Sequence, residues 1–229
     1  MTDWYHHLNE HEITVYSQTG EEGIIEEIFR RLGNRNNFLV DLGAGDGYTL
    51  SNTQYFIDRG WRGARFDLNT HDQPDLHQAV ITAENIVDLL TAHQVPRDFD
   101  LLSIDIDGTD WYVLRALLLG FHPRLLVCEI NPGFPAEPAQ AIVYNPNHRF
   151  DDCNYFGATL GAYHRLARHH GYQLLHVQES LNAFFIDAAM LPATFTPTLD
   201  FPINQYWPPD PQQRPWHLIT DADVSAGPG

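Results

Sequence analysis

The chain alternates short apolar runs with segments whose apolar residues recur every three or four positions. Runs typical of buried strands lie at 38–42, 63–67, 78–82, 99–104 and 124–130. Helical spacing occurs at 19–33, 51–60, 85–93, 111–119 and 156–170. Two further runs, 172–177 and 182–186, predict a closing antiparallel pair. This alternation predicts an α/β fold, a Rossmann-like doubly wound arrangement with a seven-stranded, mostly parallel sheet.

The length of the chain favours one domain. Its 229 residues, 43% of them hydrophobic, can build one substantial core. We expect this domain to cover residues 1–190. Residues 191–229 are rich in proline and carry Trp207 and Trp216, which predicts an extended tail that packs on the domain or joins a homodimer. The last residues, 225–229, are expected to be disordered.

The net charge of the chain restricts the classes of partner that it is expected to bind. Thirteen Lys and Arg residues stand against 30 Asp and Glu residues, a formal net charge of −17, which disfavours nucleic acid and an anionic membrane surface. A small-molecule partner is favoured. The chain shows neither an apolar segment of membrane-spanning length nor a signal-peptide pattern, so a cytoplasmic location is expected. Cys128 and Cys153 stand in no metal-binding or disulfide spacing.

A glycine-rich turn follows the first predicted strand. In Phe38-Leu-Val-Asp-Leu-Gly-Ala-Gly-Asp-Gly-Tyr48, glycine occupies every second position after Asp41 and Leu42, so the backbone can turn sharply beside a ligand. A dinucleotide fingerprint needs a third glycine where Tyr48 stands. The run instead resembles motif I of the class I S-adenosylmethionine (SAM) methyltransferases. A glycine-rich turn without a ligand is the alternative.

Acids also end the next two predicted strands. Asp67 stands where this fold places a carboxylate on the ribose of SAM, and Glu84 stands where adenine is expected. An ordinary acid at a strand end explains Asp67 equally simply. Glu84 could merely favour the positive end of the following helix.

The densest acidic cluster is Ser103-Ile-Asp-Ile-Asp-Gly-Thr-Asp110. A divalent cation would offset the repulsion among its carboxylates, and oxygen ligands suit magnesium. An EF-hand is excluded because Ala116 stands where a bidentate glutamate is needed. Strand alternation places Glu129 and Asn131 on one face, so they could meet Asp105 on one ion. Alternatively, Asp107 is the missing ligand, or Asp107 and Asp110 cap the next helix.

Two family resemblances extend this interpretation. The metal cluster resembles the magnesium site of catechol-type O-methyltransferases, although Ile130 separates two ligands that are adjacent there. Segments 16–29, 41–47, 51–53, 60–63 and 103–108 resemble the FkbM-type methyltransferases over about residues 16–187. The resemblance implies the Rossmann-like methyltransferase fold and SAM binding, with cofactor contacts expected from Asp41, Gly43, Gly45, Asp46, Asn52, Asp67, Glu84 and Asp105.

A long polar and aromatic insertion separates the last parallel strand from the next helix. Such insertions are typically functional or disordered. We expect Phe134, Tyr144 and Tyr155 to form the acceptor wall, with ordinary loop packing as the alternative. Catalytic proton transfer is assigned to Asp105, Asp107 or His148.

Together these features predict a SAM-dependent methyltransferase of secondary metabolism. O-methylation of a natural product or sugar is favoured over N-methylation, with assistance from Mg²⁺ or another divalent cation as an open question. The alternatives are a metal-dependent enzyme of another class on the same fold, and a noncatalytic binding or assembly module.

Overall fold

The computed structural model describes residues 4–69, 72–191 and 195–225. A seven-stranded sheet runs through its centre in the order β3, β2, β1, β4, β5, β8, β7. The strands are β1 (Phe38–Leu42), β2 (Arg62–Asp67), β3 (Leu76–Gln78), β4 (Asp98–Ile104), β5 (His122–Glu129), β7 (Tyr172–Gln178) and β8 (Asn182–Asp187). Neighbouring strands are parallel except at β8, which pairs antiparallel with β5 and β7. The predicted α/β fold, a Rossmann-like arrangement with a mostly parallel, seven-stranded sheet and a closing antiparallel strand, is confirmed.

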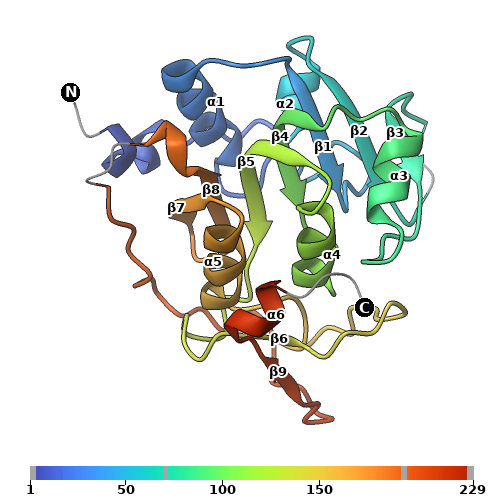
Figure 1. The fold of residues 1–229 in the computed structure, drawn as a ribbon, viewed down its shortest axis with the longest axis vertical. Coiled ribbons are helices and arrows are strands. Elements are labelled where there is room, and N and C mark those ends of the chain that lie inside the picture. Colours follow the sequence, from blue (N-terminus) through green and yellow to red (C-terminus); the bar gives the residue numbers. More distant parts are fainter. Residues whose placement is uncertain (1–3, 70–71, 192–194, 226–229) are drawn as a thin grey trace.

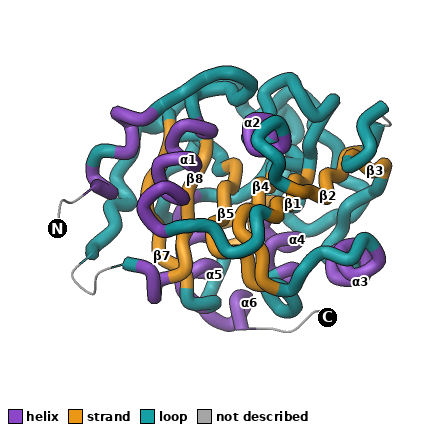
Figure 2. The backbone as a smooth tube through the Cα atoms, turned by 90° about the horizontal axis from the view of Figure 1, so that it is seen from above, coloured by secondary structure: helices purple, strands orange, loops and turns teal. Residues whose placement is uncertain are grey.

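Helices cover both faces of the sheet (Figures 1 and 2). One layer contains α1 (Glu21–Leu32) and α2 (Gln54–Ile57), preceded by the 3-10 helices Trp4–His6 and Leu8–His11. The other contains α3 (Ile86–Ala92), α4 (Asp110–Leu117) and α5 (Leu160–His169). Apolar side chains alternate between the two faces, so Val40 packs in the core on the α4 side and Leu39 in the core on the α1 side.

The order of the strands creates a reversal point beside β1. From β1 the chain moves outward through β2 to β3, and then returns to place β4 and β5 on the other side. In Figure 1 the arrowheads of β1, β2, β4 and β5 point toward the same lower edge. Ligands of open α/β sheets bind beyond such an edge, at the reversal point.

Three element boundaries differ from the sequence predictions. The predicted strand 78–82 is found at Leu76–Gln78, because the amide of Ala79 donates to the oxygen of Asp67 and the chain then leaves the sheet. The helix expected at 51–60 is the short α2. The helix expected at 156–170 begins only at Leu160, because the oxygen of Gly108 holds the amide of Gly157, whose φ is +57°.

The C-terminal segment contains regular structure. The short strand β9 (Trp216–Leu218) pairs antiparallel with β6 (Gln140–Ile142), and α6 (Asp221–Ser225) follows. The 3-10 helix Ala188–Met190 follows β8. Ser225 was expected to be disordered but ends α6; the remainder of that prediction, 226–229, lies outside the described residues. No helix within the described ranges is long and apolar enough to span a membrane.

Candidate functional site

A cavity of about 300 Å³ lies at the carboxyl ends of the central strands. Its walls come from the turn after β1, the ends of β2 and β4, the segment after β3, and the insertion after β5. The lining consists of Gly43, Gly45, residues 67–69, 79–81 and 105–109, Pro146 and residues 148–150. We call this space the strand-end cavity. It coincides with the reversal of strand order beside β1.

The glycine turn forms one wall because its residues fit where no side chain would. Gly43 has a φ of +90°, and a Cβ atom there would lie 1.6 Å from the backbone oxygen of Asp105. Gly45 also has a positive φ, +55°, but a Cβ there would meet no atom within 4 Å. Gly43 is therefore required by packing, whereas Gly45 keeps backbone accessible to a ligand.

Asp67 at the end of β2 joins the glycine turn to the cavity. Its Oδ2 accepts a hydrogen bond from the amide of Gly45 (3.0 Å), and its Oδ1 accepts one from the amide of Asn69 (2.9 Å). The carboxylate is thereby held in the cavity wall, where a ligand hydroxyl can reach it. Among the predicted cofactor residues, Gly43, Gly45, Asp67 and Asp105 line the cavity.

Four predicted cofactor residues stand outside the cavity lining: Glu84, described below, and the three residues Asp41, Asp46 and Asn52. Asp41 is 5% exposed and accepts a hydrogen bond from the Thr53 hydroxyl (2.6 Å). Burial raises the pKa of Asp41 to about 6, although Thr53 and Arg65 oppose the rise. Asp46 accepts bonds from the amides of Tyr48 and Thr49, and the Asn52 amide donates to the Ser103 hydroxyl. These contacts make the three residues supports of the turn.

A buried arginine side chain, which was not predicted from the sequence, supports the same turn. Arg65 of β2 is fully buried, and its guanidinium donates to the backbone oxygen of Gly47 (2.8 Å) and to Gln54 Oε1 (2.8 Å). It also forms two hydrogen bonds to the carboxylate of Asp75, of 2.7 and 2.9 Å. A planar guanidinium suits several fixed acceptors at once. Arginine in a short strand run was the only sequence signal.

Three carboxylates meet at the ends of β4 and β5. Asp105, Asp107 and Glu129 each offer an oxygen atom, and these atoms lie within 4.8 Å of one another. Desolvation raises the pKa of Asp105, and the charges of Asp107 and Asp110 raise it further, whereas a hydrogen bond with Glu129 opposes the rise. Desolvation also raises the pKa of Glu129, and the charge of Asp105 adds to this rise. Burial, followed by the charge of Asp110, raises the pKa of Asp107 to about 6. The cluster is electrostatically unfavourable without a cation or bound protons.

Asp110 and Asn131 both form hydrogen bonds with nearby backbone groups. The carboxylate of Asp110 accepts hydrogen bonds from the amides of Ile106 (2.7 Å) and Gly108 (2.9 Å), so it holds the loop that carries Asp107. The predicted metal ligand Asn131 donates instead to the backbone oxygens of Asn154 and Phe156, and its Oδ1 accepts from the amide of Gly133. Asp107 thus occupies the third position in the carboxylate cluster.

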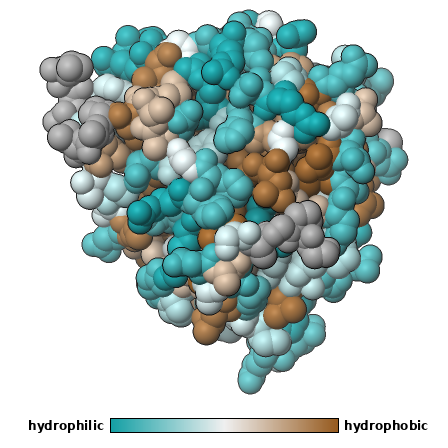
Figure 3. All heavy atoms as spheres, in the orientation of Figure 1, coloured by the Kyte–Doolittle hydropathy of each residue, from teal (hydrophilic) through white to brown (hydrophobic). Residues whose placement is uncertain are grey.

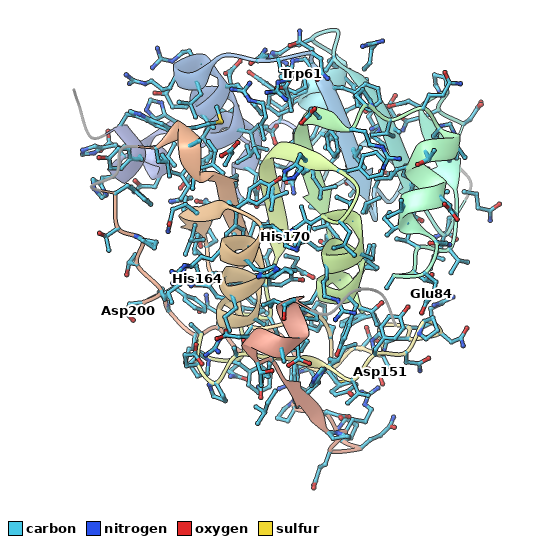
Figure 4. All side chains as sticks on the ribbon, in the orientation of Figure 1. Trp61, Glu84, Asp151, His164, His170 and Asp200 are labelled. Carbon is cyan, nitrogen blue, oxygen red and sulfur yellow. The ribbon has the colours of Figure 1, made fainter. Side chains whose placement is uncertain are left out.

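The aromatic residues assigned to the acceptor wall lie elsewhere. Phe134 packs on Trp216 with 4.8 Å between ring centroids, and the Tyr155 hydroxyl donates to the oxygen of Pro215. Tyr144 donates to Glu84 Oε2 (2.5 Å) and accepts from the amide of Ala83 (3.2 Å). Neither Glu84 nor these aromatic residues line the strand-end cavity. Figure 4 shows Glu84 below α3, at the edge near the insertion.

His148 lines the strand-end cavity, as a catalytic residue would have to. Its ring lies close to Gly108, where a Cβ atom would be 3.1 Å from His148 Cδ2. Its Nε2 is buried without a hydrogen-bond partner among the described residues. Burial, with Arg214 as a second cause, lowers the pKa of His148. A neutral imidazole with an unpartnered nitrogen can exchange a proton with a ligand.

Comparisons with known proteins find similarity in structure. No family model matches the sequence, and no curated protein matches it either. A SAM-dependent methyltransferase from Archaeoglobus fulgidus is 15% identical, with a TM-score of 0.39, covering 67% of this chain and 70% of its own. A methyltransferase of the mycinamycin biosynthetic pathway, in complex with Mg and SAH, is 16% identical, with a TM-score of 0.40, covering 77% of this chain and 49% of its own.

Proposed function

We propose that this protein is a SAM-dependent methyltransferase that methylates a hydroxyl group of a small molecule with the help of a divalent cation. The observation that carries the proposal is the strand-end cavity. It lies at the reversal of strand order, between a glycine turn that leaves backbone accessible and a carboxylate at the end of β2. This is where a nucleoside bound to such a sheet has its ribose and its charged tail.

The residues of the cavity divide the work between the two reactants. Asp67 is positioned to accept hydrogen bonds from ribose hydroxyls, and the open side of Gly45 leaves room for the methionine portion of SAM. Asp105, a member of the acidic cluster, follows β4 and lines the cavity beside Gly43 of the glycine turn. Methyl transfer is an in-line displacement, so the enzyme must chiefly align the acceptor oxygen with the methyl group.

The acidic cluster supports the cation part of the proposal. Asp105, Asp107 and Glu129 supply only oxygen atoms, which are the ligands of magnesium and manganese. Desolvation is the largest cause of their raised pKa values and neighbouring carboxylates add to the rise, so a bound dication would stabilise the charged forms. When bound, such an ion supplies a Lewis acid that lowers the pKa of an acceptor hydroxyl.

Side chains of the protein can also remove the proton of the acceptor hydroxyl. His148, whose buried Nε2 has no partner among the described residues, and Asp105 both line the cavity, so we assign removal of the proton from the acceptor oxygen to one of them. The hydroxyl loses that proton as the new C–O bond forms and the C–S bond of SAM breaks. The products are the methyl ether and S-adenosylhomocysteine.

Calorimetry with SAM and S-adenosylhomocysteine tests the cofactor. We expect both to bind the folded protein. If neither binds at millimolar concentration, the methyltransferase proposal is wrong.

Manganese titration tests the ion separately. Asp105→Asn should weaken Mn²⁺ binding by roughly 100-fold, because it removes a direct ligand charge. Asp88→Asn, which changes an exposed acid of α3, is the matched control and should bind as the wild type does. Equal Mn²⁺ affinity in the two variants would remove the cation from the mechanism while leaving SAM binding intact.

A further inference from the structure

A second and larger cavity lies against the outer sides of α3 and α4. Its volume is about 850 Å³, within the range of roughly 300–1,000 Å³ that is usual for small-molecule sites. Most of its lining is apolar: Val87 from α3, Ala116 and Leu119 on and after α4, and Val143 after β6. Figure 3 shows an apolar patch between these helices on the face that Figure 1 presents. We call this space the helix-side cavity.

An aromatic pair forms one wall of the helix-side cavity. The rings of Tyr112 and Tyr144 lie with their centroids 4.9 Å apart. The Tyr112 hydroxyl is within 2.9 Å of the oxygen of Ile142 and 2.8 Å of His217 Nδ1, so it is satisfied inside the protein. The rings therefore present mainly carbon surface to the cavity, which suits an alkyl or aromatic body.

The charged residues of the lining are not equivalent. Glu84 is hydrogen-bonded to Tyr144. Arg115 donates one hydrogen bond, to the backbone oxygen of Asp223 (2.9 Å), and forms no ion pair with a carboxylate of the described residues. The carboxylate of Asp223 is itself paired with His217 Nε2 (3.2 Å) and with Thr220.

These hydrogen bonds and ion pairs indicate whether the polar group of a ligand in this cavity is positively or negatively charged. A partly buried guanidinium with unused donors in the lining of an apolar cavity is complementary to an anion. A carboxylate there would accept a two-pronged hydrogen bond from Arg115, while the rest of the ligand leaves water for the apolar wall. A positive head group would be repelled by Arg115 and would compete with Tyr144 for the carboxylate of Glu84.

We propose that the helix-side cavity is a binding site for an amphipathic monocarboxylic acid, with its carboxylate on Arg115 and its apolar body between α3 and α4. No residue of this cavity lines the strand-end cavity, so the site is separate from the proposed methyl transfer. The proposal does not depend on SAM binding.

Titration with decanoate, decanol and decylamine tests both the cavity and the sign. By calorimetry, we expect decanoate to bind the wild type with the highest affinity of the three. Arg115→Met should weaken decanoate binding about 10-fold and leave decanol binding within about twofold, because it removes the charge and keeps apolar bulk.

Leu119→Glu is a second variant that avoids the core, because Leu119 is 52% exposed. It should weaken decanoate binding more than 10-fold through charge repulsion and strengthen decylamine binding. Ile203→Glu, at a residue with 49% exposure outside this cavity, is the control and should leave all three affinities unchanged.

Three results would overturn the proposal. Decanoate could fail to bind at millimolar concentration, or it could bind Arg115→Met and Leu119→Glu as tightly as the wild type. The third result is a concentration-dependent dimer, seen by sedimentation, that Leu119→Glu dissociates while decanoate has no effect on it. That outcome would assign the cavity to a second copy of the chain.

Discussion

The two cavities lie close together but are built on opposite principles. Residues 79–81 and 146–150 face the strand-end cavity, whereas Ala83, Glu84, Val143 and Tyr144 of the same two segments face the helix-side cavity. The first is formed by strand ends, glycines and carboxylates. The second is formed by the sides of two helices and is lined mostly by apolar carbon atoms.

This difference shows what each kind of cavity costs the fold. At the strand ends, clustered carboxylates with raised pKa values oppose folding at neutral pH, and the glycine turn is held by a hydrogen bond from Arg65. The helix-side cavity requires little beyond leaving apolar surface uncovered. Costly arrangements of this kind are typical of sites that carry chemistry.

The largest expected effect is a difference in stability between alanine substitutions at two positions of the glycine turn, Gly43 and Gly45. Gly43→Ala should lower the free energy of unfolding by about 4 kcal/mol, because its Cβ would overlap the oxygen of Asp105 and its φ is positive. Gly45→Ala should lower it by only about 1 kcal/mol, the cost of a left-handed alanine in open space. Urea unfolding of both variants measures the contrast.

Ligand binding completes this comparison. Gly45→Ala places a methyl group on the open side of the turn, so it should weaken S-adenosylhomocysteine binding while decanoate binding is unchanged. Equal stability of the two alanine variants would contradict the packing role of Gly43. Unchanged S-adenosylhomocysteine affinity in Gly45→Ala would contradict the placement of the cofactor.

The next effect concerns pH and the buried acid behind the turn. The pKa of Asp41 rises from 3.8 to about 6 on folding, so the folded state holds a proton that the unfolded state releases. Stability contributed by that proton is present below pH 4 and is lost as the pH rises to about 6, a loss of about 3 kcal/mol. Asp41→Asn should reduce the fall in unfolding free energy between pH 4 and pH 7 by about this amount.

Urea unfolding at several pH values checks the prediction for Asp41, with Asp88→Asn as the control. The acidic cluster adds its own pH dependence in both proteins, since the pKa values of Asp105, Asp107 and Glu129 are also raised. Parallel stability curves for the wild type and Asp41→Asn would mean that the carboxylate of Asp41 is not desolvated in the folded protein.

The sequence predicted the sheet and the residues at its strand ends, because apolar runs and glycines are local signals. Asp67 and Asp105, which these local signals singled out, both line the strand-end cavity, and their contact with a cofactor stays a prediction. The role of Asn131 as a metal ligand stays a prediction. Its amide donates to Asn154 and Phe156, and contacts across more than 20 residues leave no local pattern.

The helix-side cavity gave no signal in the sequence. Arg115 and Leu119 have the spacing of an ordinary amphipathic helix, and only the packing of α3 beside α4 shows that they border a cavity. The bond between Tyr144 and Glu84 likewise joins residues 60 positions apart. This hydrogen bond places Tyr144 and Glu84 in the protein wall between the two cavities, which we call the partition, instead of in direct contact with a ligand of the strand-end cavity.

The smallest predicted effect tests that partition. Tyr144→Phe removes the hydroxyl that bonds to Glu84 and to the amide of Ala83 while it keeps the ring beside Tyr112. The following residues 146–150, which cover the strand-end cavity, should then be held less firmly, and the affinity for S-adenosylhomocysteine should fall about fivefold, the equivalent of about 1 kcal/mol. Decanoate affinity should change less than twofold, since the ring surface is retained.

Tyr206→Phe, at an exposed hydroxyl, is the matched control for calorimetry with both ligands. A loss of decanoate affinity equal to that of S-adenosylhomocysteine would show that Tyr144 supports both cavities, and the contrast between them would then stop short of their shared wall.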